Sequence, residues 1–98
     1  MTKRERRACG DPLVSIVIPA YNPRFFAECL DSALRQTYGS IEIVIADDSA
    51  GPEIESIVTS RGSQRPVRYQ RNSTRLRPRG NFIRCFEEAR GEFVKFLC

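Results

Sequence analysis

Short apolar runs and segments of helical periodicity alternate along this chain. Residues 14–18 and 41–45 are mostly Val and Ile, with few polar side chains among them. Apolar runs of this kind, without strict alternation, are typical of strands that are buried on both faces, as in a parallel sheet. Pro19 is expected to end the first strand, because proline cannot donate to a sheet ladder.

Three segments of helical periodicity predict helices. Apolar side chains recur at helical spacing from about Phe25 to Leu34, and Pro23 suits the start of that helix. Residues 52–60 predict a second helix. Asn81 can cap a third helix. The apolar positions of this third helix are Phe82, Ile83, Phe86 and Ala89.

Two weaker strands complete the pattern. Residues 67–70 predict a strand near an edge, because only alternate residues are apolar, and residues 92–98 start a fourth strand after Gly91. Residues 71–80 have no periodicity and are expected to form a loop. The order βαβαβαβ predicts an α/β fold, with an open, mostly parallel four-stranded sheet and helices on both faces. Because the chain stops inside the fourth strand, we expect a truncated domain.

The composition is that of one small globular domain. With 98 residues the chain can bury one modest core. The basic residues 1–11 have no apolar segment after them, so we expect a disordered tail and not a secretory signal. No run approaches the roughly 20 apolar residues of a membrane helix. Without C-x-x-C spacing or histidine, the cysteines favour reduced thiols in the cytoplasm over a zinc site or disulfides. They are Cys9, Cys29, Cys85 and Cys98.

Basic residues are concentrated in one part of the chain. No acidic residue lies between Glu55 and Glu87, whereas that interval holds eight arginines and no lysine. Either this stretch is a solvated basic face, or it binds anionic ligands such as phosphates or nucleic acid. The use of arginine alone favours bidentate phosphate contacts. The eight are Arg61, Arg65, Arg68, Arg71, Arg75, Arg77, Arg79 and Arg84.

Asp47 and Asp48 follow the second strand, at the edge of a parallel sheet where ligands bind. In the simplest interpretation they turn the chain and cap the second helix. In the alternative, one carboxylate caps the helix while the other faces a cleft, since adjacent side chains point different ways. The loop that follows the first strand, residues 19–22, lies next to this edge.

Three classes of ligand compete for such a cleft. A dinucleotide site would have G-x-G-x-x-G after the first strand, where this chain has Pro-Ala-Tyr-Asn-Pro. A receiver-like phosphorylation domain would place its acidic pair after the first strand and its phosphate acceptor after the third, where this chain has Arg71. A uridine nucleotide needs an aromatic face, an acceptor for its ring N–H and cations for its diphosphate. Tyr21, Asp48 and the arginine-rich loop offer these groups.

Residues 14–22, 32–38, 42–49 and 91–97 together resemble the amino-terminal half of a family-2 glycosyltransferase of the GT-A fold, over residues 13–98. The resemblance implies a nucleotide-diphosphate-sugar donor, usually a UDP-sugar, and transfer with inversion at the anomeric carbon. The acceptor, whether sugar, lipid or protein, is not indicated.

The resemblance also implies which residues bind the nucleotide. Pro19, Ala20 and Tyr21 resemble the loop that holds the uracil and ribose, and Asp48 resembles the residue that hydrogen-bonds the base. Residues 75–79 match the stretch that often reaches the diphosphate, a loop that varies in the family. The full candidate set is Pro19, Ala20, Tyr21, Asn22, Asp47, Asp48, Arg77 and Arg79.

No catalytic residue or metal ligand is expected within these residues. The family's D-x-D motif, which would hold Mg²⁺ or Mn²⁺ in the full-length enzyme, should follow the fourth strand, and the catalytic base lies further on. We therefore expect residues 12–98 to be a donor-nucleotide-binding part that cannot transfer sugar alone. We expect it in the cytoplasm, with a full-length form possible at the cytoplasmic face of a membrane. The alternatives are a small basic nucleic-acid-binding module, whose affinity would fall steeply with salt, and a non-catalytic truncated remnant.

Overall fold

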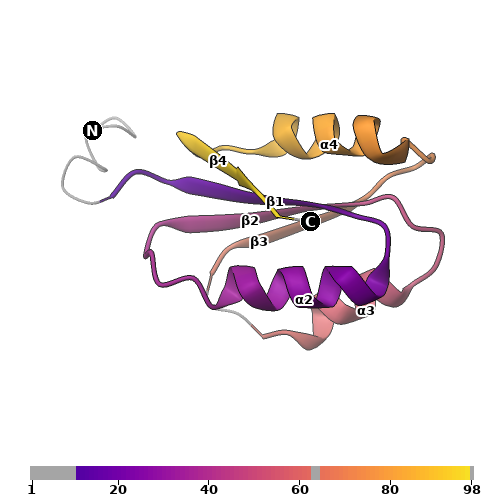
Figure 1. Ribbon diagram of the computed structural model, residues 1–98, viewed down its shortest axis with the longest axis horizontal. Helices are drawn as coiled ribbons and strands as arrows, with labels where there is room; N and C mark the ends of the chain where they lie inside the picture. Colours follow the sequence, from indigo (N-terminus) through magenta and orange to yellow (C-terminus); the bar gives the residue numbers. More distant parts are fainter. Residues whose placement is uncertain (1–10, 63–64, 98) are drawn as a thin grey trace.

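A four-stranded parallel sheet forms the centre of the computed structural model, which describes residues 11–62 and 65–97. The strand order is β3-β2-β1-β4, and each neighbouring pair is parallel. Helices α2 and α3 cover one face of the sheet and α4 covers the other (Figure 1). The elements are β1 (Val14–Ala20), α2 (Pro23–Leu34), β2 (Ile41–Asp47), α3 (Glu53–Ser60), β3 (Val67–Arg71), α4 (Arg77–Glu88) and β4 (Phe93–Phe96).

This architecture confirms the predicted α/β class, the βαβαβαβ order and the edge position of the third strand. The tail predicted for residues 1–11 lies, apart from Asp11, outside the described residues, as do Cys9 and Cys98. Among the described residues, no helix is long and apolar enough to cross a membrane.

The central strands β1 and β2 are buried on both faces, as their apolar runs predict. Ile16 and Ile43 belong to the larger core, which α2 and α3 cover. Val17 and Val44 face the other way and form a smaller core with Cys85 of α4. Burial raises the pKa of the Cys85 thiol to about 11, so this cysteine acts as a packed apolar group.

The prediction that Pro19 ends the first strand is wrong, because β1 continues to Ala20 and pairs Pro19 with Ala46. The backbone explains how proline is tolerated there. Ala20 accepts from Asp48 N on the β2 side, whereas Val17 accepts from Leu97 N on the β4 side. Pro19, two residues after Val17, therefore turns its nitrogen toward β4, which pairs with β1 only as far as Val17.

The loop predicted over residues 71–80 is present only at 72–76, and the prediction of Asn81 as helix cap is wrong. Arg71 belongs to β3, and α4 begins at Arg77. Asn81 lies inside the helix and is 2% exposed. The cap comes from a distant strand, since the Asp48 carboxylate accepts hydrogen bonds from the backbone N–H groups of Leu76 and Arg77. Local sequence patterns do not contain this contact.

The apolar face predicted for α4 is not the face that packs on the sheet. Asn81 and Cys85 are the buried residues of the helix, whereas Phe82, Ile83 and Phe86 remain exposed. Phe82 stacks on Phe96 of β4, with ring centroids 4.0 Å apart. The aromatic side chains thus lie along the outer margin of α4, next to the edge strand.

A buried polar cluster fastens the α4–β4 connection at the amino end of the sheet. Glu42 accepts hydrogen bonds from the Ser15 hydroxyl, from Arg90 N at 2.7 Å and from Arg68 Nη2 at 3.0 Å. Burial alone would raise the pKa of Glu42, but these donors hold it below its usual value. Gly91 N donates to Ser15 Oγ at 2.8 Å, which brings the start of β4 against β1.

Candidate functional site

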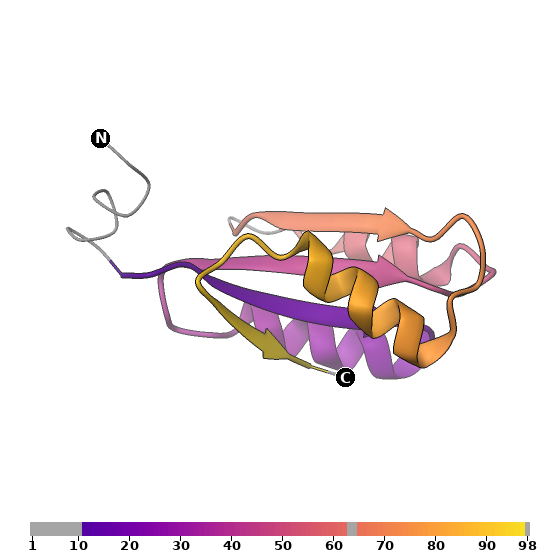
Figure 2. The same cartoon turned by 90° about the horizontal axis from the view of Figure 1, so that it is seen from above.

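The carboxyl ends of β1, β2 and β3 lie at one side of the sheet, where the β3–α4 loop crosses (Figure 2). Tyr21, Asp48 and Asn72 are the first residues after these three strands. They share a pocket of about 370 Å³ at this edge. Its lining consists of Tyr21, Asp48, Ser49, Ala50, Arg71, Asn72, Ser73, Thr74 and Arg75.

Asp48 fastens the β3–α4 loop to the end of β2. Its Oδ1 accepts from Leu76 N at 2.7 Å and from Asn72 Nδ2 at 2.9 Å, and its Oδ2 accepts from Arg77 N at 2.8 Å. Arg75 Nε lies 3.4 Å from Oδ2. Burial would raise the pKa of this carboxyl, but the N–H donors outweigh burial and hold the pKa below its usual range. Asp48 is therefore ionised at neutral pH.

The backbone is strained at Arg77, whose N–H donates to this carboxylate. Arg77 has φ 67°, the only positive φ among the described residues that are not glycine. A left-handed conformation is costly for a side chain as large as arginine, and such outliers concentrate at functional sites. The carboxylate of Asp48 accepts from the N–H of that same residue, which keeps the strained turn in place.

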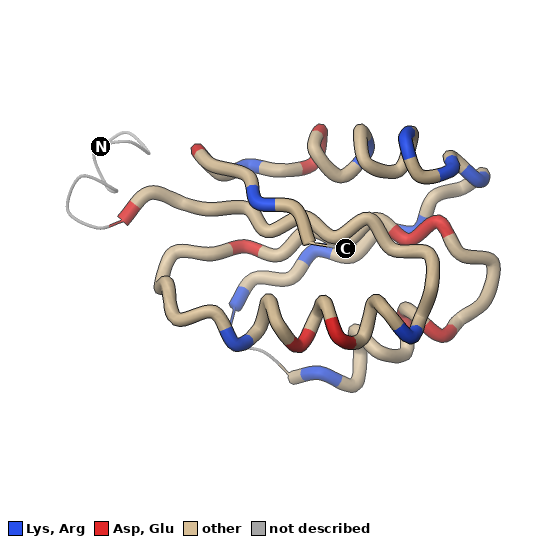
Figure 3. Tube along the Cα trace, in the orientation of Figure 1, with Lys and Arg blue, Asp and Glu red and all other residues tan. Residues whose placement is uncertain are grey.

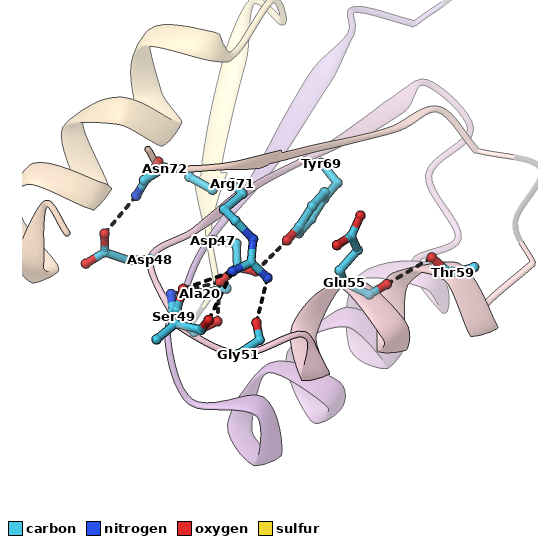
Figure 4. Close-up of polar contacts among 12 residues, drawn as sticks. Ala20, Asp47, Asp48, Ser49, Gly51, Glu55, Thr59, Tyr69, Arg71 and Asn72 are labelled. Atoms are coloured by element: carbon cyan, nitrogen blue, oxygen red, sulfur yellow. Dashed lines mark hydrogen bonds and ion pairs between the residues drawn. The ribbon is translucent and has the colours of Figure 1, made fainter. Parts of the chain in front are cut away.

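Asp47 points away from the pocket and is completely buried. Its Oδ1 accepts from Ser49 N at 2.9 Å, and its Oδ2 accepts from the Tyr69 hydroxyl and lies 3.6 Å from Arg71 Nη2 (Figure 4). Burial, together with the bond to Asp47, raises the pKa of Tyr69 to about 12. The two adjacent carboxylates thus diverge, as expected, and Asp47 has a structural role in the turn.

The expected cap of the second helix by this acidic pair is not present. The residue before α3 is Pro52, and no side-chain hydrogen bond from the residues that the structure describes caps that helix. The predicted chain turn is confirmed, because Asp47 and Ser49 form an Asx turn. The helix-capping carboxylate is that of Asp48, and the helix that it caps is α4.

Two asparagines connect Asp48 to the centre of the sheet. Asn81 Nδ2 donates to Ala46 O at 2.9 Å and to Ala20 O at 3.4 Å. Its Oδ1 accepts from Asn72 Nδ2 at 2.8 Å, and that same nitrogen donates to Asp48. Because backbone carbonyls accept only, they fix the orientation of both amides and aim the donor group of Asn72 at the carboxylate.

Tyr21 stands at the mouth of the pocket and is 53% exposed. The guanidinium carbon of Arg75 lies 4.2 Å from its ring centroid, a cation–π contact. On its other side Tyr21 borders a second pocket of about 190 Å³, which Pro19, Ala20 and Asn22 also line. Asn22 additionally caps α2, since its Oδ1 accepts from Arg24 N at 3.0 Å.

Most of the arginine-rich stretch holds the fold together and is not a free basic face. Six of the eight arginines have internal partners: Arg61, Arg65, Arg68, Arg71, Arg75 and Arg84. Within the described part of the chain, the guanidinium groups of Arg77 and Arg79 have no hydrogen-bond or ion-pair partner. Basic residues gather at the start of α4 beside the acidic end of β2 (Figure 3). A nucleic-acid-binding module accordingly loses its main support.

The structure therefore divides the candidate set among three positions. Tyr21 and Asp48 share the larger pocket. Pro19, Ala20 and Asn22 line the smaller one, whereas Asp47 is buried behind the site. Arg77 and Arg79 are exposed on the first turn of α4 and belong to the lining of neither pocket.

Sequence reasoning missed the site roles of Asn72 and Asn81, and it included Arg75 only within the stretch 75–79. The position of Asn72 directly after the third strand was the available signal, because polar residues at that point of a parallel strand face the ligand edge. Nothing local marks Asn81, whose partners are 35 and 61 residues away in sequence.

The acidic pair does not fit a divalent cation. N–H and O–H donors, and not open lone pairs, surround the oxygens of Asp47 and Asp48. Across residues 11–62 and 65–97, no group of three His, Cys, Asp or Glu side chains could hold a metal ion.

A parallel sheet with a polar pocket at its carboxyl edge is an open α/β arrangement of the GT-A type. The model of the glycosyl transferase family 2 matches residues 15–97, and the chain belongs to this family. It is 45% identical over 62 residues to the uncharacterized glycosyltransferase RP339 of Rickettsia prowazekii. It is 37% identical over 90 residues to the uncharacterized glycosyltransferase EpsJ of Bacillus subtilis.

These matches cover 62% and 88% of this chain but only 20% and 25% of the relatives, so the chain spans about a quarter or less of their length. The crystal structure of S. aureus TarS superposes with a TM-score of 0.73 at 24% identity, covering 87% of this chain and 16% of TarS. At that identity the likeness shows the fold alone.

Proposed function

We propose that this chain supplies the donor-nucleotide site of a family-2 glycosyltransferase, and that the donor is a UDP-sugar used for inverting transfer to an acceptor hydroxyl. The observation that carries this proposal is the pocket in which the Tyr21 ring and the ionised Asp48 lie together. Its volume of about 370 Å³ lies within the usual range for small-molecule sites.

Each group in the pocket suits one part of such a donor. The Tyr21 ring offers a face on which a base can stack. The Asp48 carboxylate can accept only, and uracil and guanine offer it a ring N–H that cytosine and adenine lack. We assign the diphosphate to Arg77 and Arg79, which are exposed in the first turn of α4 and have no side-chain partner among the described residues.

A calorimetric titration with UDP, GDP, CDP and ADP tests this proposal. We expect UDP to bind best, with GDP as the critical competitor because guanine also carries a ring N–H. Tyr21→Ala should weaken UDP binding about fivefold or more, since base–aromatic stacking is worth roughly 1–3 kcal/mol. Tyr21→Phe keeps the ring and should bind like the wild type. Equal affinity for all four nucleotides would refute the uridine assignment.

The metal ion, the turnover of the donor and the location of the protein are further parts of this proposal. The expected Mg²⁺ or Mn²⁺ would be held by residues other than Asp47 and Asp48, whose donors leave no room for an ion. We predict that this chain alone does not turn over a UDP-sugar. Release of UDP from the donor in the presence of the chain would contradict this prediction. We place the protein in the cytoplasm, where the thiols of Cys29 and Cys85 would stay reduced.

One relative has a name that states its acceptor. A Campylobacter jejuni relative, 27% identical over 89 residues, is named as a beta-1,3-glucosyltransferase acting on GalNAc(5)-diNAcBac-PP-undecaprenol. This match covers 29% of that protein, so it supports the reaction class and leaves the acceptor of this chain open.

A further inference from the structure

Arg75 contacts both groups that the proposed function assigns to the base, the Tyr21 ring and the Asp48 carboxylate. Its guanidinium lies 4.2 Å from the Tyr21 ring centroid, and its Nε lies 3.4 Å from Asp48 Oδ2. The guanidinium thus lies against the ring face and beside the carboxylate oxygen, the two places where a uracil would stack and donate its ring N–H. We propose that Arg75 competes with the base and moves to the phosphates when a nucleotide binds, an inference that rests on the proposed function.

The acceptor positions of Asp48 show why the base and Arg75 exclude each other. A carboxylate offers about four lone-pair positions. Three of them accept from Leu76 N, Arg77 N and Asn72 Nδ2, all of which the fold holds in place. The fourth faces Arg75. A ligand N–H can therefore reach the carboxylate only after Arg75 leaves it.

Arg75 is held loosely enough to leave. Its side chain is 43% exposed, and one ion pair and one cation–π contact are its interactions among the described residues. Arg71, on the opposite wall of the pocket, is held by the carbonyls of Ser49, Ala50 and Gly51 and by Asp47. Of the two arginines that line the pocket, Arg75 is the one that can change partners.

This exchange makes Arg75 a specificity-determining residue. A nucleoside must displace the guanidinium and gives it no new partner, so the displacement weakens binding. A nucleoside diphosphate offers the displaced guanidinium a bidentate anionic partner within reach of the same loop. The pocket thereby favours phosphorylated ligands over free nucleosides, beyond the attraction of a general positive charge.

Titration of wild type and Arg75→Ala with uridine and UDP, followed by calorimetry and by the NMR signals of the Tyr21 ring, tests the proposal. Arg75→Ala should bind uridine about three- to tenfold more tightly, because an exposed cation–π contact and a surface ion pair no longer compete. The same variant should bind UDP about tenfold more weakly, because a charge-assisted bond to phosphate is lost.

Arg84→Ala is the matched control. This variant also removes one arginine charge, but Arg84 lies in α4 and its guanidinium donates to Gln70 Oε1 outside the pocket lining. It should leave uridine affinity unchanged. Uridine affinity that is unchanged or lower in Arg75→Ala would overturn the inference, even if wild type prefers UDP to the other nucleotides.

The proposed function can fail separately. If UDP and ADP bind equally while Arg75→Ala still binds nucleosides more tightly, the exchange stands and the uridine assignment falls. If the wild-type chain binds neither uridine nor UDP, the proposed function falls and the inference falls with it.

Discussion

Replacing Asp48 by Asn tests whether this carboxylate holds the fold as well as the ligand. In the structure Leu76 N and Arg77 N donate to different oxygens of Asp48. Asparagine keeps one oxygen, so one of these N–H groups would face the amide NH₂, another donor. A buried donor without a partner costs about 1–3 kcal/mol, and loss of a bond to a charged group adds to this. We expect Asp48→Asn to lower the free energy of unfolding by about 2–4 kcal/mol.

Urea denaturation followed by circular dichroism measures this loss as a lower midpoint at unchanged slope. Asp31→Asn is the matched control, because the Asp31–Arg61 pair joins side chains that are 39% and 35% exposed. Surface ion pairs contribute little to stability. The control should therefore lose only a small fraction of what Asp48→Asn loses, and equal losses in the two variants would refute the capping argument.

The same variant has a defined pH dependence. Because the folded pKa of Asp48 lies below the ordinary value of 3.8, its stabilisation is complete above that value and is lost as pH falls through the folded pKa. The stability difference between wild type and Asp48→Asn should therefore be largest near neutral pH and shrink at acidic pH. A difference that stays constant down to pH about 2 would show that the charge of Asp48 does not stabilise the fold.

Two backbone positions give further predictions. Gly91→Ala should destabilise the chain by about 1–3 kcal/mol, because its Cβ would lie 2.7 Å from Ser15 Oγ and 2.8 Å from Leu13 O. Gly39→Ala, where a Cβ meets nothing within 4 Å, is the control and should not destabilise in the same urea assay. Arg77→Gly should stabilise by up to about 1 kcal/mol because it relieves the positive φ of 67°; a lower urea midpoint for this variant would contradict the strain.

The fold was largely predictable because it is encoded in local patterns. Apolar runs at β1 and β2, helical periodicity before and after β2, and their alternation predict the parallel sheet and its covering helices. Pro19 and the start of α4 were mispredicted because their explanation is not local. The end of β4 leaves room for the proline nitrogen, and a carboxylate 29 residues before Arg77 caps the helix.

The candidate site was predictable only as far as strand ends determine it. Tyr21 and Asp48 follow neighbouring strands, and the sheet brings them into one pocket. Asn72 and Arg75 complete that pocket from the other side, but the loop that carries them has no periodicity from which to place a side chain. The charge pattern was misleading, because most arginines of the basic stretch bind carboxylates and carbonyls that precede them in sequence.

The Asp48 carboxylate contributes to stability and to ligand recognition through different acceptor positions. Oδ1 and part of Oδ2 serve the fold through Leu76, Asn72 and Arg77, and these contacts do not need to break for a ligand to bind. Only the acceptor position that faces Arg75 is exchangeable, and the same Arg75 side chain also contacts the Tyr21 ring. Since Asn81 ties Asn72 to the ends of β1 and β2, the remaining acceptor is held in a fixed direction by the sheet. A ligand therefore meets a rigid acceptor and one movable cation, and a preorganised site of this kind spends little of its binding energy on ordering the protein.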